Sequence, residues 1–496
     1  EIVVPAAEEV DWVQAISAFS LETLDGTVLV ASQREGTGQM VTADVRARLE
    51  SLHDTGHLRL KVRTPPQVTV LAPVAEVPGF GWRGWAPADA AAVEPVAVTE
   101  SGTAGPVVAN GLVTLSVDPT DGTFALDGHG GLGRLVDGGD CGDTYNWCPP
   151  TADTVVDTPD AVEVTVAERG PMRARVLVVA RYRWPAACEG LERRVGEVPH
   201  EVRTVLELQA GERAVHVEVT VDNRSRDHRL RAHFPLPSPA ERSRAECAFG
   251  TVERGLVAEG GPTEAPLPTY PAQRFVQAGG LTVVHDGVAE YELVEVRDGA
   301  AHELALTLLR ATGMLSQRPM TTRPLPAGPL VRLEGPQLQR RLSLRYVVAV
   351  GDVDPYALAD QVLVPLRVAG ADGATRGPTP AAPSAGAAGD APGTGPADLP
   401  ATGSALAVDG AVVSAVVREG DALAVRLFNP TDETAGVTLD GRRGWLVDLR
   451  GRPLAPFDGG FALRPRGIAT ATLAPSGPAD NAVVAATALG HEPSVS

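Results

Sequence analysis

The sequence is poor in several residue types, and each shortage excludes a class of protein. Its 496 residues include only four cysteines, and aromatic residues make up 4%. Four cysteines without a C-x-x-C pair are too few for a disulfide scaffold or a zinc finger in so long a chain. No apolar run approaches the ~18 residues that a membrane-spanning helix needs. We therefore expect neither a disulfide-rich nor a membrane protein.

Positive charge is also scarce. Lys and Arg total 43 against 62 Asp and Glu, which gives a formal net charge of −19. This acidity disfavours binding to nucleic acid and to anionic membranes, and leaves neutral or cationic small partners open. We expect Cys141, Cys148, Cys188 and Cys247 to be free thiols in a cytoplasmic protein, with a Cys141–Cys148 bridge left open as the alternative.

The chain starts with Glu1-Ile2-Val3-Val4-Pro5, without an initiator methionine. This start leads us to expect a fragment or a processed product.

Alternation of apolar and polar residues persists from about residue 107, which indicates strands with one buried face. The strand-like segments are residues 112–117, 162–166, 173–182, 202–208, 214–221, 281–284, 291–296, 304–309 and 342–350. Amphipathic helices are not evident there, and one helix is expected at residues 43–53. The pattern predicts a mainly β protein with one large antiparallel sandwich.

Composition and pattern together divide the chain into five parts. They are a small, incomplete β-rich N-terminal domain (1–100), the large sandwich (101–370), an Ala/Gly/Pro-rich linker or disordered loop (371–403), a C-terminal β-sandwich (404–475) and a tail (476–496). The linker has almost no large apolar side chain, so it cannot bury enough surface to offset its ordering entropy.

Residues 138–150 combine glycines, a proline pair, two carboxylates, a phenol and an indole. Glycine permits sharp turns and proline forbids helix, which predicts a stiff surface loop presenting Asp143 and Tyr145. The other interpretation is a tight turn whose Tyr and Trp cap a sheet.

Two further clusters carry charge. Asp227, His228 and Arg229 follow a strand, and are either an acid–base or anion-binding group or a structural ion network. A Pro/Gly-shaped loop carries Arg318 and Arg323, which either bind hydroxyl or carboxylate groups or tie the loop down.

Motifs of catalysis and metal binding are missing. The sequence has no H-E-x-x-H, P-loop, G-x-S-x-G or Rossmann glycine pattern, and its histidines show no paired ligand spacing. We therefore assign no catalytic residue and no metal ligand.

Taken in order, these clusters resemble the C-terminal β-rich half of the α-mannosidases of glycoside hydrolase family 38. The segments that carry the resemblance are Gly142-Asp143-Thr144-Tyr145-Asn146, Leu206-Glu207-Leu208 with Asp222-Asn223, Asp227-His228-Arg229-Leu230-Arg231, Gln273-Arg274-Phe275-Val276, Glu290-Tyr291-Glu292, residues 304–318, Thr322-Arg323-Pro324 and Ala327-Gly328-Pro329. Residues 77–81 are similar to the family's boundary between a small β domain and a supersandwich of galactose-mutarotase type, and residues 411–473 to its terminal β domain.

The resemblance implies that this chain lacks the family's zinc-dependent catalytic domain, so zinc is expected there and no cofactor is expected here. It implies an α-mannoside-type glycan as ligand, and docking onto the missing catalytic domain or a partner subunit. Tyr145 would reach the bound sugar, Asp143 would orient the loop or touch sugar, and the loop with Arg318 and Arg323 would lie near the cleft rim.

Two alternatives belong to other functional classes. The first is a stand-alone carbohydrate-binding or scaffold protein. The second is an epimerase-like enzyme housed in the supersandwich, with His285 or His228 and Glu290 or Glu292 as acid and base.

Overall fold

The chain in a computed structural model divides into two compact units, Glu1–Ala72 and Pro73–Ser496. The described residues are 2–5, 18–23, 28–32, 57–63, 71, 73–74, 76–84, 93–100, 105–369 without 288 and 319, 375–376, and 400–473 without 421. The helix expected at residues 43–53, most of the linker 371–403 and the tail 476–496 lie outside them. The predicted domain boundaries stay predictions.

The first unit contains one antiparallel sheet in the order β1-β4-β2-β3. Its strands are β1 (Ile2–Pro5), β2 (Ala18–Thr23), β3 (Val28–Ser32) and β4 (His57–Arg63).

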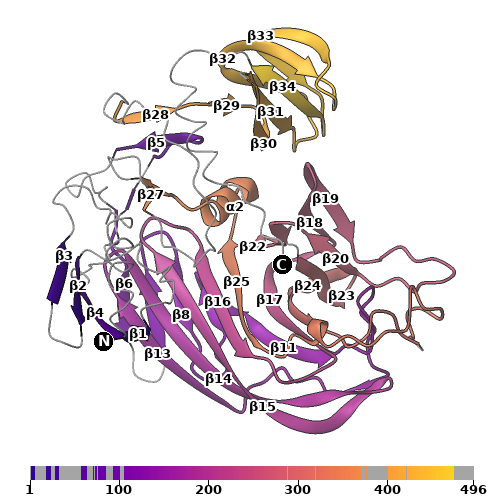
Figure 1. Ribbon diagram of the computed structural model, residues 1–496. Helices are drawn as coiled ribbons and strands as arrows, with labels where there is room; N and C mark the ends of the chain where they lie inside the picture. The colour runs from indigo at the N-terminus through magenta and orange to yellow at the C-terminus, as the bar shows by residue number, and fades with distance from the viewer. Residues whose placement is uncertain are drawn as a thin grey trace. The chain divides into compact units, whose positions relative to one another are not determined.

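The larger part of the second unit contains three sheets (Figure 1). A five-stranded sheet, ordered β10-β9-β8-β7-β6, contains β6 (Ala97–Glu100), β7 (Pro106–Ala109), β8 (Thr114–Val117), β9 (Phe124–Leu126) and β10 (His129–Leu132). A second five-stranded sheet, ordered β11-β17-β24-β23-β20, contains β11 (Arg134–Gly139), β17 (His228–Ala240), β20 (Thr269–Ala272), β23 (Ala289–Arg297) and β24 (Ala300–Ala311).

The third sheet has ten strands in the order β13-β14-β15-β16-β25-β22-β21-β18-β19, with β12 paired to β15. They are β12 (Ala152–Asp153), β13 (Ala161–Arg169), β14 (Arg173–Glu189), β15 (Glu192–Gln209), β16 (Val215–Asp222), β18 (Arg242–Cys247), β19 (Gly250–Gly255), β21 (Phe275–Ala278), β22 (Leu281–His285) and β25 (Arg341–Val350). The β12–β15 pair is parallel, and the other strand pairs described in this sheet are antiparallel.

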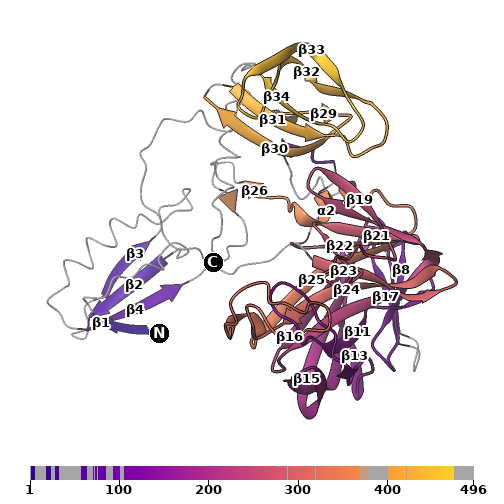
Figure 2. The ribbon, with the colours of Figure 1, turned by 90° about the vertical axis from the view of Figure 1, so that its right-hand side faces the viewer.

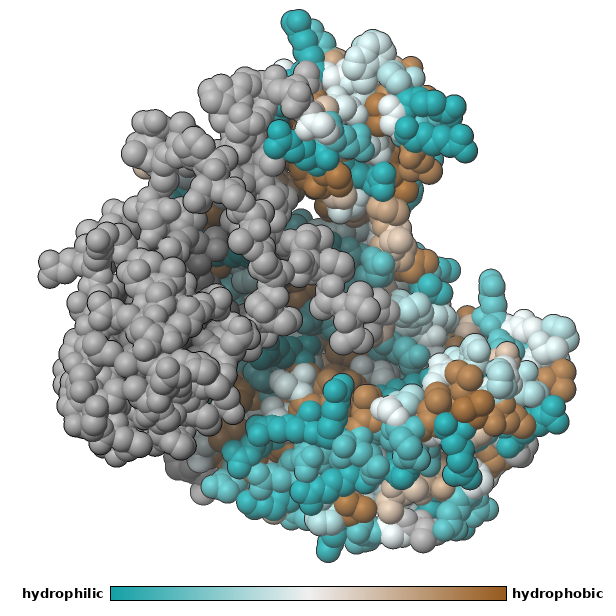
Figure 3. Space-filling view, in the orientation of Figure 1, coloured by the Kyte–Doolittle hydropathy of each residue, from teal (hydrophilic) through white to brown (hydrophobic). Residues whose placement is uncertain are grey.

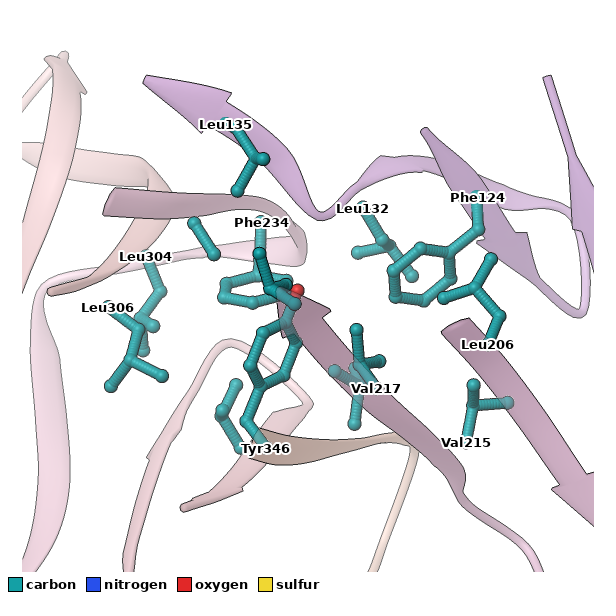
Figure 4. Close-up of a cluster of buried hydrophobic side chains, with 14 of the residues drawn as sticks. Phe124, Leu132, Leu135, Leu206, Val215, Val217, Phe234, Leu304, Leu306 and Tyr346 are labelled. Atoms are coloured by element: carbon teal, nitrogen blue, oxygen red, sulfur yellow. The ribbon is translucent and has the colours of Figure 1, made fainter. Parts of the chain in front are cut away.

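Alternate side chains of these strands are buried in one shared core, and this packing makes the three sheets a supersandwich. Along β16, Val215, Val217, Val219 and Val221 are buried, whereas the residues between them are half-buried. Side chains from all three sheets meet in one core, in which the Phe234 ring packs edge-on against a tyrosine of β25 at 5.5 Å between centroids (Figure 4). The prediction of a mainly β fold with a large antiparallel sandwich is confirmed.

A six-stranded sheet follows in the order β29-β32-β34-β31-β30, with β33 paired to β32, and Figure 2 shows it as a layered module. Its strands are β29 (Val408–Asp409), β30 (Val412–Glu419), β31 (Ala422–Phe428), β32 (Ala435–Val447), β33 (Pro453–Leu463) and β34 (Ile468–Leu473). Two short pairs complete the described strands, β5 (Gly81–Arg83) with β28 (Thr402–Ser404), and β26 (Val368–Ala369) with β27 (Thr375–Arg376).

One α-helix of the described part, α2 (Pro355–Leu363), was missed by the periodicity analysis. Asp354 caps it by accepting hydrogen bonds from the Tyr356 and Ala357 backbone N–H groups, and Pro355 occupies its first turn. Tyr356 of this helix packs against Phe275 and Phe428. A 3₁₀ turn, η5 (Gly335–Gln337), precedes β25. Within the described residues, no helix combines the length and apolarity needed to cross a membrane.

Candidate functional site

The loop of residues 140–151 leaves β11 and is folded back on itself by its own backbone. The Cys141 N–H donates to the Cys148 carbonyl at 2.9 Å, and the Asp143 N–H donates to the Asn146 carbonyl at 3.1 Å. A Cβ at Gly142 would lie 2.1 Å from the Asn146 carbonyl oxygen, so this turn requires glycine. All four cysteines are free thiols, which leaves the Cys141–Cys148 bridge unmade.

Asp143 lies under this loop rather than on its surface, with no exposed area. Its Oδ1 accepts from the backbone N–H groups of Tyr145 and Asn146 at 3.0 and 3.1 Å, and its Oδ2 accepts from the Gln317 N–H at 2.9 Å. Arg323 donates to the same carboxylate. The expectation that the loop presents Asp143 on the surface is wrong, because all of these hydrogen bonds hold its carboxylate inside the loop. Contact of Asp143 with a substrate stays a prediction.

Residues 312–331 form a second loop, which is hydrogen-bonded to the first. The Thr144 N–H donates to the Met314 carbonyl at 3.1 Å, and its hydroxyl donates to the Leu315 carbonyl at 2.8 Å. The Thr312 hydroxyl and the Gln317 amide donate to carbonyls of the first loop at 3.1 and 2.7 Å. Two loops far apart in sequence are therefore bonded into one rigid unit, which we call the loop pair.

The two arginines predicted for this site lie in different environments. Arg323 is buried and donates to Asp143 and to the side-chain oxygen of Asn146, while its guanidinium carbon lies 5.8 Å from the centre of the Tyr145 ring. Arg323 thus ties the loop down. Arg318 is exposed and forms no ion pair with the residues that the structure describes. The structure brings Tyr145, Asp143 and Arg323 together, without Arg318.

Tyr145 is an exposed aromatic side chain of the loop pair, with 54% of its surface accessible. Its phenol oxygen lies close to Gly328, where an added Cβ would be 3.1 Å from it. Because the backbone beneath the ring is fixed by Asp143, the ring is presented in a set orientation. A phenol can hydrogen-bond a hydroxyl group while its face packs on an apolar surface.

Charge is also buried beneath the loop. Arg310 binds the Asp140 carboxylate at 2.6 Å, and Asp140 Oδ1 accepts from the Gly142 and Cys148 backbone. Burial raises the pKa of Asp140, and the Arg310 guanidinium opposes that shift. These bonds hold the base of the loop against β24.

Trp147 has a role that sequence reasoning missed. Its indole N–H donates to the Gly139 carbonyl at 3.0 Å, and the Arg229 guanidinium carbon lies 3.8 Å from its ring centre. Arg229 is buried and also pairs with Glu292. Burial lowers the pKa of Arg229, whereas the Glu292 carboxylate raises it. Trp147 and Arg229 lie far apart in the sequence, so no local pattern signals this cation–π contact.

The cluster with Asp227, His228 and Arg229 is a structural network. His228 and Arg229 belong to β17, and both are buried. The His228 Nδ1 lies 2.6 Å from Asp137 Oδ1, and Asp137 also binds the buried Arg193. These groups serve each other, so the structural interpretation holds over the acid–base one.

Of the acid–base pairs considered for an epimerase, His228 and Glu292 are occupied in the networks above. His285 and Glu290 instead line one cleft of about 650 Å³, together with residues of β24 and β25. No group of three or more His, Cys, Asp or Glu side chains capable of holding a metal occurs in the described part of the chain.

Comparisons with known proteins bear on this arrangement. Residues 108–315, which include the loop 140–151 and most of the supersandwich, match the family described as "Glycosyl hydrolases family 38 C-terminal domain". This region is therefore similar to a family 38 C-terminal domain. The resemblance inferred from the motifs is confirmed.

Solved structures show the same fold. A crystal structure of an α-mannosidase from Enterococcus faecalis matches 95% of this chain with a TM-score of 0.61 and 18% identity. A family 38 glycosyl hydrolase structure from the same species matches 92% with a TM-score of 0.60 and 19% identity. The chain covers 53% of each, so it spans about half the length of these proteins.

A curated relative matches over a shorter range. A Halalkalibacterium halodurans protein named "Putative mannosylglycerate hydrolase" is 29% identical over 206 residues, which is 37% of this chain and 22% of the relative. The chain is therefore homologous to the C-terminal region of such hydrolases.

Proposed function

We propose that this chain is the β-rich C-terminal region of an α-mannosidase-like glycoside hydrolase. In this proposal the loop pair forms part of the wall of a sugar-binding cleft. A zinc-dependent catalytic domain outside this sequence supplies the nucleophile, the acid and the metal. The exposed ring of Tyr145, held by the buried Asp143–Arg323 pair, is the observation that carries the proposal.

The surface around Tyr145 suits docking as well as sugar contact. Leu325, Leu330 and Val331 on the second loop are exposed at 59%, 55% and 45%. Exposed apolar side chains gathered beside a polar contact residue are typical of an interaction surface. Figure 3 shows both apolar and hydrophilic groups on the visible described face. We propose that this loop surface meets the catalytic domain.

Hydrolysis of an aryl α-mannoside tests the proposal. The purified chain, with and without added zinc at pH 5 to 7.5, is expected to show no turnover, because the proposal places both catalytic carboxylates elsewhere. Addition of a separately produced family 38 catalytic half with zinc is expected to restore turnover. Hydrolysis by the chain alone would refute the proposal.

Tyr145 variants then test the cleft wall in the reconstituted enzyme. Tyr145→Phe is expected to lower kcat/KM about tenfold if the phenol donates one hydrogen bond to sugar. Tyr145→Ala is expected to lower it further, because the packing face is lost too. Trp445→Ala is the matched control, since Trp445 is 49% exposed and lies on β32, far along the chain from the loop pair. Equal kcat/KM for Tyr145→Ala and Trp445→Ala would exclude Tyr145 from the cleft.

A further inference from the structure

A cleft of about 650 Å³ lies where two sheets of the supersandwich meet. β22 and β25 of the ten-stranded sheet supply His285 and Leu344, and β23 and β24 of the five-stranded sheet supply Glu290, Thr307 and Leu308. None of its lining residues belongs to the loop 140–151. The volume falls within the ~300–1,000 Å³ typical of small-molecule sites.

Three polar atoms of residues that line this cleft have no hydrogen-bond partner in the described structure. They are Nε2 of His285, Oε2 of Glu290 and Oγ1 of Thr307. An unpaired buried polar atom costs about 1–3 kcal/mol, so native proteins retain few of them. Three such atoms around one cleft indicate a site that a ligand completes.

The proton on His285 can be placed from its contacts. The side chain is only 3% exposed, and its Nδ1 lies 2.8 Å from the Gly287 carbonyl oxygen. A carbonyl accepts and never donates, so Nδ1 carries the proton. Burial lowers the pKa of His285, which favours the neutral ring with a lone pair on Nε2. Nε2 is therefore an acceptor without a donor.

Both arginines that line the cleft are paired with carboxylates, so the cleft offers a ligand mainly hydrogen-bond acceptors. Arg310 is engaged by Asp140, and the exposed Arg345 lies 3.4 Å from Glu218. Glu290 and His285 then present two acceptors, and the Thr307 hydroxyl can donate or accept. The rest of the wall contains the polar residues Asp286 and Ser343 and the apolar residues Ala289, Leu306, Leu308, Leu309 and Leu344. A ligand that fits must carry several donors on an apolar frame.

From this arrangement we propose that the cleft is a second binding site, which takes a neutral polyhydroxylated ligand of pyranose type. Ligand hydroxyls donate to His285 Nε2 and Glu290 Oε2 and exchange a hydrogen bond with Thr307, while ring C–H groups pack on the leucines. All three atoms are buried in the structure, so binding requires the half-buried side chains of Glu290 and Thr307 to rotate toward the ligand and the His285 ring to be uncovered. The inference does not rest on the proposed hydrolase role.

Ligand-observed NMR with methyl α-D-mannopyranoside tests the site on the full chain alone. Saturable binding is expected for the wild type. Thr307→Val keeps the shape and removes a hydroxyl that has no partner, so the fold is expected to persist while the dissociation constant rises about tenfold. Glu290→Gln, which exchanges an acceptor oxygen for an amide donor, is expected to weaken binding at least as much. Thr204→Val, at a half-buried strand threonine of β15 outside the cleft, is the matched control and is expected to bind like the wild type.

Three results would overturn the proposal. The wild type could show no saturable binding of the sugar, or Thr307→Val and Thr204→Val could bind it with equal affinity. The third is that Tyr145→Ala loses binding while Thr307→Val keeps it. Displacement of the sugar by n-butylammonium would show a cation site instead. Because this assay needs no turnover, its outcome is independent of whether a catalytic half restores hydrolysis.

Discussion

The buried pair of Arg323 and Asp143 is the residue-scale feature on which the loop pair depends. Their side chains are 5% and 0% exposed. Removal of one partner leaves an uncompensated buried charge, which typically costs about 3–5 kcal/mol. We therefore expect Arg323→Ala to lower the free energy of unfolding by roughly that amount, measured by urea denaturation.

Arg318→Ala is the control for that substitution, because Arg318 lies on the same loop and is exposed. It is expected to change the free energy of unfolding by less than about 0.5 kcal/mol. The double variant Asp143→Ala/Arg323→Ala is expected to be more stable than the sum of the single variants predicts, because neither charge is then buried alone. Strict additivity would show that the pair does not hold the loop.

At the scale of the element, α2 depends on its cap. Asp354 Oδ1 accepts from the N–H groups of Tyr356 and Ala357 at 2.9 and 3.3 Å. Asp354→Ala leaves these groups without that acceptor and is expected to cost about 1 kcal/mol in urea unfolding. The nearby exposed Asp352 provides the control, and Asp352→Ala is expected to change stability by less than about 0.5 kcal/mol. Equal effects of both substitutions would contradict the capping role.

At the scale of the whole molecule, buried histidines make stability depend on pH. Burial lowers the pKa of His200, His233 and His285 in the folded state. As pH falls below the unfolded value of ~6.5, the unfolded chain binds protons that the folded chain does not. The free energy of unfolding is therefore expected to fall with decreasing pH, by up to ~1.4 kcal/mol per pH unit for each such histidine.

Urea unfolding at pH 5, 6 and 7.5 checks this expectation. Glu303 adds to the loss at lower pH, because hydrogen bonding from His233 and the charge of Arg134 lower its pKa and its contribution disappears once it is protonated. His233→Gln is expected to make the slope between pH 7.5 and 5 shallower. Equal stability at the three pH values would refute the argument.

Much of the fold was predictable because its strands alternate visibly. β16 and β25 lie within a residue of the segments predicted from periodicity, since a two-residue repeat of valine and polar residues has one buried face. α2 was missed although Asp354-Pro355 is a helix-start signal, because nine residues offer little periodicity. The loop 140–151 and its exposed Tyr145 were predictable from glycine and proline chemistry.

The sequence by itself determined the mainly β class, the family 38 relationship of residues 108–315 and the position of the Tyr145 loop, since these follow from local pattern and motif. Only the tertiary structure decided that Asp143 is buried against Arg323, and that His285 and Glu290 share a cleft while His228 and Glu292 do not. The physical reason is that ion pairs and clefts depend on which strands become neighbours. Arg323 lies 180 residues from Asp143 along the chain, and sheet order, rather than spacing, brings them together.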